Sequence, residues 1–204
     1  PTDSLREFAA YNGQSFLIPK ISGKVETQDL HGMVQTDLII VTHPLFLQQA
    51  NALAVLHRTQ DSLNVVVATT DQIYNEFSSG AQDVCAIRDF VKMFYERAKT
   101  DSLLFPKYLL LFGDGSYDHK SKSSSNTNYI PTYQSLNSLN VAGSFVSDDF
   151  YGALDDNEGN LGADLVDIGI GRIPSKTKEE AQAVVNKILK YAQANEASAS
   201  SFGD

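Results

Sequence analysis

The chain has 204 residues, of which 42% are hydrophobic and 20% charged, an ordinary composition for a globular domain with a sizeable core. Its net charge of -9 argues against non-specific binding to nucleic acid or to anionic membranes. The single cysteine, Cys85, excludes an internal disulfide and a multi-cysteine zinc site, and the sequence has no apolar run of about 18 residues that would span a membrane.

Residues 1–36 mix short apolar pieces with glycine and proline, which predicts an irregular, partly β lead-in at the end of a preceding region. From residue 37 onward, apolar runs alternate with amphipathic stretches. The runs predict strands at 38–41, 64–68, 108–112 and 166–171. Helices are expected after Pro44, over 72–77, over 84–98 as the longest, and after a capping box of Thr177 and Glu180.

Strands that alternate with helices predict an α/β fold with a doubly wound, mainly parallel sheet. The strand at 166–171 is the expected edge of that sheet. Residues 113–146 read as one long polar connection, and loops of this length in compact domains are usually functional or mobile.

Asp114 lies within Gly113-Asp114-Gly115, directly after the strand at 108–112. Glycines allow a sharp turn there, and ligands of open α/β sheets bind at this carboxyl edge. The spacing does not match a phosphate-binding loop, because Asp118 stands where the last glycine would be. A phosphoaspartate receiver is also disfavoured, because Thr42 and His43, not two acidic residues, follow the first strand.

A cysteine nucleophile needs a base within hydrogen-bond reach. Cys85 falls in the first turns of the predicted 84–98 helix, where a cysteine is usually a core or boundary residue. None of the four histidines stands in a metal-binding spacing such as H-E-x-x-H.

Acidic residues crowd the stretch from 148 to 167: Asp148, Asp149, Asp155, Asp156, Glu158, Asp164 and Asp167. They form either a solvated acidic loop or a cation site, because converging carboxylates repel unless a cation neutralises them. Calcium, which takes six to eight oxygens in flexible geometry, would suit such a loop. The stretch is not an EF-hand, since Asn160 and Val166 replace its turn glycine and its closing glutamate.

Several motifs resemble, in order, the gingipain family of cysteine peptidases, whose catalytic unit is caspase-like. They are YLLLFGDGSYD at 108–118, PTYQ at 131–134, SDDFYG at 147–152 and IGIGRIP at 168–174. Residues 23–31 and 77–83 are similar to the branch of the family that comprises the sortases of type IX secretion in Bacteroidetes.

The resemblance implies that the chain is the first of two α/β halves. Residues 37–197 would form the caspase-like subdomain and 198–204 the start of a link to the second subdomain, which carries the catalytic histidine and cysteine. This chain then has no catalytic residue and is inactive by itself. The parent would be a secreted endopeptidase at the outer membrane or cell surface of a Gram-negative bacterium. It would cleave C-terminal secretion signals from cargo proteins, with secretion-system components as partners.

The resemblance also implies a calcium ion. Its ligands would be Asp114, Asp167 and the backbone oxygen of Leu165, with Asp155 and Asp156 as candidates for the rest. The alternative function is a non-catalytic, calcium-stabilised scaffold or interaction domain.

Overall fold

The structure, a computed structural model, describes residues 12–13, 18–21, 23–120, 123, 125–136, 139–140, 142–159 and 164–200, with only the backbone described for 195–200. The strands are β1 (Leu38–Thr42), β2 (Val65–Thr69), β3 (Tyr108–Phe112), β4 (Tyr133–Gln134), β5 (Val146–Ser147) and β6 (Gly169–Ile173). The α-helices are α1 (Leu47–Thr59), α2 (Thr70–Phe77), α3 (Val84–Ala98) and α4 (Lys178–Ser200). Three short 3₁₀ helices are η1 (Pro44–Phe46), η2 (Ser102–Leu104) and η3 (Asp149–Tyr151).

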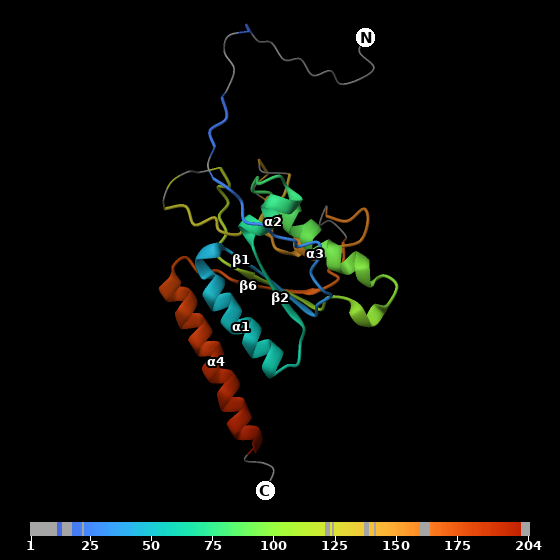
Figure 1. Ribbon diagram of the computed structural model, residues 1–204, viewed down its shortest axis with the longest axis vertical. Coiled ribbons are helices and arrows are strands. Elements are labelled where there is room, and N and C mark those ends of the chain that lie inside the picture. The colour runs from blue at the N-terminus through green and yellow to red at the C-terminus, as the bar shows by residue number, and fades with distance from the viewer. Residues whose placement is uncertain are drawn as a thin grey trace.

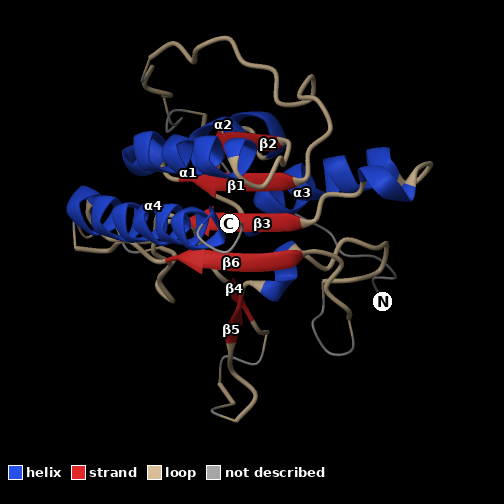
Figure 2. Ribbon diagram, turned by 90° about the horizontal axis from the view of Figure 1, so that it is seen from below, coloured by secondary structure: helices blue, strands red, loops and turns tan. Residues whose placement is uncertain are grey.

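The main sheet has the order β2-β1-β3-β6, and every neighbouring pair is parallel. All five residues of β1 are buried, as expected of an apolar run that lies between two layers of helices. Figure 2 shows the four strands side by side, with the β4–β5 ribbon beyond β6. The predicted α/β fold with a doubly wound parallel sheet is confirmed, and β6 lies at the sheet edge as expected.

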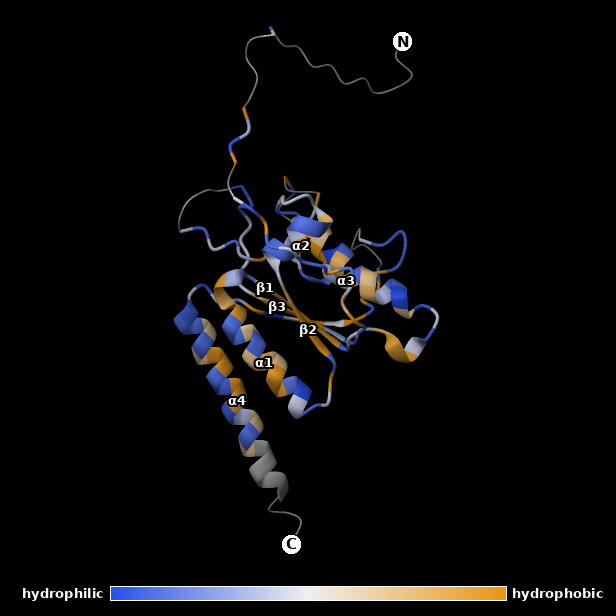
Figure 3. Ribbon diagram, in the orientation of Figure 1, coloured by the Kyte–Doolittle hydropathy of each residue, from blue (hydrophilic) through white to orange (hydrophobic). Residues whose placement is uncertain are grey.

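Helices cover both faces of the sheet (Figure 1). On one face, α1 and α4 enclose a core that includes Ile40, Phe46 and Phe112. On the other face, α2 and α3 enclose a core with Ile39 and Phe90. Figure 3 shows the hydrophobic strands between these helices. None of the helices in the described part is both long and apolar enough to cross a membrane.

The fourth strand and the longest helix differ most from the predicted elements. The fourth strand begins at Gly169, three residues later than expected. The preceding segment leaves the ladder because the Asp167 amide donates to the Gly152 carbonyl and its carboxylate accepts from the Leu154 amide. The prediction that the 84–98 helix is the longest is wrong, because α4 has 23 residues and α3 has 15. Beyond its apolar stripe, α4 continues on alanine, glutamine and glutamate, which favour helix without packing.

The connection from 113 to 146 is not wholly irregular, since β4 and β5 pair in antiparallel fashion at its end and Ile130 within it is fully buried. The described residues of the lead-in, at 12–13, 18–21 and 23–36, contain no strand. Leu30 is nonetheless 1% exposed, and its amide donates to the Glu76 carboxylate on α2. The rest of the lead-in and residues 201–204 of the expected link lie outside the described residues, whereas 198–200 continue α4.

Thr69 forms the capping box of α2: its hydroxyl accepts from the Gln72 amide, while the Gln72 side chain accepts from the Thr69 amide. Thr69→Ala should lower the free energy of unfolding by about 1 kcal/mol, because it leaves an amide of the first turn without its acceptor. Urea denaturation would measure this loss. Thr59→Ala at the exposed end of α1 is the control, and an equal loss in both variants would contradict the capping role.

Candidate functional site

The carboxyl edge of the sheet is held together by the segment that follows β3. Gly113, at φ +153°, makes the expected turn. The Asp114 carboxylate accepts a hydrogen bond from the Thr127 hydroxyl at 2.5 Å and lies 3.9 Å from the Lys176 ammonium. The Asp114 carbonyl accepts from the amides of Tyr129 and Ile130. Asp114 therefore fastens this edge to the segment around residue 129.

Arg172, at the end of β6, is the centre of this edge. Its Nε atom donates to one carboxylate oxygen of Asp148 and its Nη2 atom donates to the other, each at 2.7 Å. Its Nη1 atom donates to the carbonyls of Gly113 and Ile130 at 3.0 and 2.9 Å. The side chain of Arg172 is 12% exposed, and a bidentate pair of this kind is both strong and geometrically specific. One guanidinium thus joins both ends of the β3–β4 connection to Asp148, which follows β5.

The other four predicted calcium ligands lie at the amino end of the strands, opposite to the edge that carries Asp114. β3 and β6 run parallel and in register, from Tyr108 beside Gly169 to Phe112 beside Ile173. Asp114 follows the carboxyl end of β3, whereas Asp167 precedes the amino end of β6. A five-residue strand, about 16 Å at 3.3 Å per residue, therefore separates them.

At that amino end, the Tyr95 hydroxyl brings two of the predicted ligands together. It donates to Asp155 at 2.9 Å and lies 3.5 Å from an Asp167 oxygen. Burial and these carboxylates raise the pKa of Tyr95. Asp156 pairs instead with the Lys92 ammonium at 2.8 Å, a hydrogen bond that lowers the pKa of Asp156. The side chain of Leu165 is 78% exposed.

The five predicted ligands therefore do not form one calcium site. The expectation is wrong in grouping Asp114 with the other four, because the parallel register places them at opposite edges. Among the described residues, no three His, Cys, Asp or Glu side chains are grouped so that they could hold a metal ion. Calcium binding itself stays a prediction.

Cys85 lies exposed in the first turn of α3, where its amide donates to the Asp83 cap. Partial desolvation of the thiol and the nearby Asp83 carboxylate raise the pKa of Cys85, which disfavours the nucleophilic thiolate.

The four histidines have other partners. His31 pairs with Glu76 and His57 with Asp61, while His119 lies 3.4 Å from Gln134. His43 accepts from the Leu45 amide, packs 4.4 Å from the Tyr129 ring, and has its pKa lowered by burial. The described residues thus provide no cysteine paired with an imidazole base.

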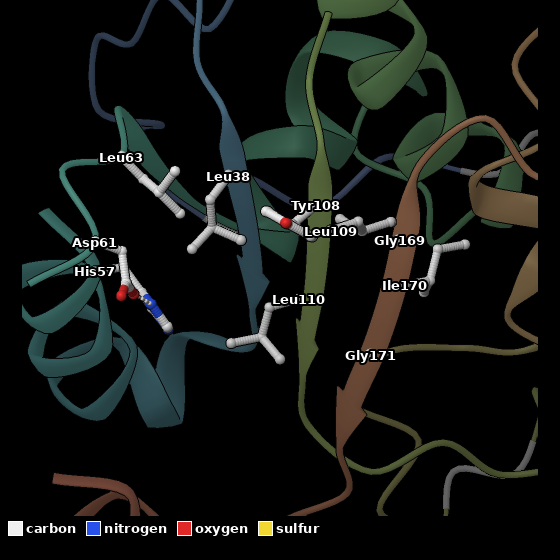
Figure 4. A pocket seen from close by; sticks show the side chains of 10 residues that line it. All are labelled: Leu38, His57, Asp61, Leu63, Tyr108, Leu109, Leu110, Gly169, Ile170 and Gly171. Carbon is white, nitrogen blue, oxygen red and sulfur yellow. Dashed lines mark hydrogen bonds and ion pairs between the residues drawn. The ribbon is translucent and has the colours of Figure 1, made fainter. Parts of the chain in front are cut away.

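A hollow of about 690 Å³ opens on the α1/α4 face, at the amino ends of β1, β3 and β6 (Figure 4). In β6, Gly169 and Gly171 contribute no side chains to the hollow, whereas Ile170 between them does line it. A Cβ atom added at Gly171 would meet nothing within 4 Å. The wall is mostly apolar, with the His57–Asp61 ion pair at one side (Figure 4). The hollow lies at the opposite end of the strands from the edge where α/β sheets bind ligands.

Sequence reasoning missed two arginines whose side chains link distant segments: Arg172 at the carboxyl edge of the sheet and Arg88 on α3. Arg172 stands at the end of a predicted strand, where a partly buried arginine requires a carboxylate partner, so this signal was available. Arg88 lies on the predicted 84–98 helix, and nothing in its sequence neighbourhood indicates its contacts with residues 153–158, about 65 positions later.

The family model described as Peptidase family C25 matches residues 33–202. No curated protein matches the chain. Among solved structures, the crystal structure of dimeric latent PorU from Porphyromonas gingivalis is 38% identical, with a TM-score of 0.75 over 83% of this chain. The chain spans 17% of the length of that PorU chain.

These matches agree with the motifs quoted above and with the parallel sheet. The family match covers more than half of the chain, and the PorU structure is 38% identical over 83% of it. The chain therefore belongs to peptidase family C25, the gingipain family of cysteine peptidases.

Proposed function

We propose that this chain is the first subdomain of a secreted cysteine endopeptidase of the sortase type, whose catalytic histidine and cysteine lie in another part of the parent protein. The match to Peptidase family C25 over residues 33–202 carries the proposal. The chain has one cysteine, exposed on α3 with a raised pKa, and each described histidine contacts other groups.

The parent would remove C-terminal secretion signals from cargo proteins at the surface of a Gram-negative bacterium. The likeness to PorU supports this proposal. Within the parent, the subdomain would serve as a rigid platform: Arg172 and Asp114 pin the loops of its carboxyl edge, so a neighbouring subdomain would meet a preformed surface. Cargo proteins, the second subdomain and secretion-system components are the partners that this role requires.

The 204-residue chain alone should release no peptide from a cargo protein with a C-terminal signal, whereas the purified parent should cleave it. Cys85→Ala in the parent should retain nearly full activity, because Cys85 is not the nucleophile. Alkylation of thiols with iodoacetamide should inactivate the wild type and this variant equally. Mass spectrometry of the cleavage products would measure the activity of the isolated chain, of the wild-type parent and of the Cys85→Ala parent.

Loss of cleavage in a folded Cys85→Ala parent would show that Cys85 is the nucleophile, against the proposal. A folded parent without any cleavage activity, insensitive to alkylation, would favour the non-catalytic scaffold instead.

A further inference from the structure

Residues 153–159, here named the 153–159 loop, fold around the guanidinium of Arg88. The Nε atom of Arg88 donates to the carbonyl of Ala153 at 2.7 Å. Its Nη2 atom donates to the carbonyls of Asp155 and Glu158 at 3.4 and 3.2 Å. Three backbone carbonyls from one short loop therefore converge on one cation.

The loop has the shape that this contact requires. Gly159 has a φ of +111°, which favours glycine, and a Cβ atom there would lie 3.7 Å from the Arg88 Cζ atom and 3.3 Å from the Phe150 ring. The Arg88 Cζ atom lies 5.5 Å from the centre of that ring, a cation–π distance. The guanidinium thus contacts both the Phe150 ring and the 153–159 loop.

The carboxylates of this region are engaged elsewhere. Asp155 accepts from Tyr95, Asp156 pairs with Lys92, and Asp167 accepts from the Leu154 amide. A calcium ion needs six to eight oxygens at about 2.3–2.6 Å. Here the carbonyls face a guanidinium and each of these carboxylates has a hydrogen-bond donor, so the donor set does not fit the ion that the family resemblance implies.

We propose that Arg88 is the built-in cation of the 153–159 loop and takes the place of that calcium ion. Its fixed fork of donors gathers carbonyls that would otherwise diverge, and its charge offsets the acidic side chains of the same loop. The loop is then ordered by a covalently attached cation and is independent of the calcium concentration. This role goes beyond the proposed peptidase function and requires no activity to test.

The test is thermal unfolding of the 204-residue chain and of the parent, each in 1 mM calcium chloride and in EDTA. The wild-type melting temperature should be the same in both. Arg88→Ala should lower it by about 5 °C, because three carbonyls lose a charged donor. Arg88→Lys keeps the charge but loses the forked set of donors, so its melting temperature should fall between those of the wild type and Arg88→Ala.

Chemical rescue distinguishes the effect of the three carbonyl contacts of Arg88 from the effect of its positive charge. About 20 mM guanidinium chloride should restore part of the loss in Arg88→Ala, relative to sodium chloride at the same ionic strength, since the free ion can enter the space vacated between these carbonyls. Lys92→Met is the matched control. It removes a positive charge that lies on the same helix and pairs with Asp156 of the same loop, but it removes no carbonyl contact. This control should melt close to wild type and show no rescue.

Two results would overturn the proposal. A wild-type chain or parent that melts several degrees higher in calcium than in EDTA would place the cation outside Arg88. An Arg88→Ala variant as stable as Lys92→Met would show that the carbonyl contacts do not order the loop. If Arg88→Ala fails to fold, the comparison of calcium with EDTA on the wild type and on the Arg88→Lys variant still decides whether Arg88 or calcium orders the loop.

Discussion

Arg172→Met should lower the free energy of unfolding by about 3 kcal/mol, because breaking a largely buried ion pair leaves its partner charge uncompensated. The Asp148 carboxylate, 24% exposed, would lose both of its guanidinium bonds. The carbonyls of Gly113 and Ile130 would lose a shared donor at the same time. Chemical denaturation with a shared m-value would measure the loss.

A double variant tests the reason for that loss. Arg172→Met combined with Asp148→Leu should be more stable than Arg172→Met alone, since replacing both charges removes the unpaired carboxylate. Lys99→Met, which breaks the pair with Glu96 in which both side chains are 40% exposed, is the control and should leave the denaturation midpoint nearly unchanged. If Arg172→Met behaves like this control, the guanidinium does not hold the carboxyl edge together.

Phe90→Ala should lower the free energy of unfolding by about 4 kcal/mol, the cost of deleting a fully buried aromatic side chain and leaving a cavity. Phe90 is 0% exposed and makes edge-on contacts with Phe77 and Phe94, at 5.7 and 5.4 Å between ring centres. For a chain of this length, the melting temperature should fall by about 10 °C. Differential scanning calorimetry would measure the shift.

The matched control is Leu103→Ala on η2, where the side chain is 83% exposed. Its effect should stay within about 0.5 kcal/mol, as for most surface substitutions. Phe90→Leu should fall between the two, because it keeps part of the buried volume. Equal melting temperatures for Phe90→Ala and Leu103→Ala would show that α3 is not packed against the sheet.

The central strands could be predicted from the sequence because a strand covered on both faces must be apolar along its whole length. β1 and β3 are such runs, and their predicted bounds differ from the structure by at most one residue. β6 was placed less accurately. Its sequence, GIGRI, has two glycines and a charged residue, so the apolar pattern carries little information about where it begins. The family motifs, which are local in sequence, were equally accessible.

Only the tertiary structure decided which side chains meet. The family resemblance assigned Asp114 and Asp167 to one calcium site, but parallel pairing of β3 with β6 places them at opposite edges of the sheet. The cation in the 153–159 loop comes from Arg88, about 65 residues earlier, brought there by the packing of α3 against η3. Local composition records that a loop is acidic. The neutralising charge depends on which helix packs beside that loop, and contacts between distant segments determine this packing.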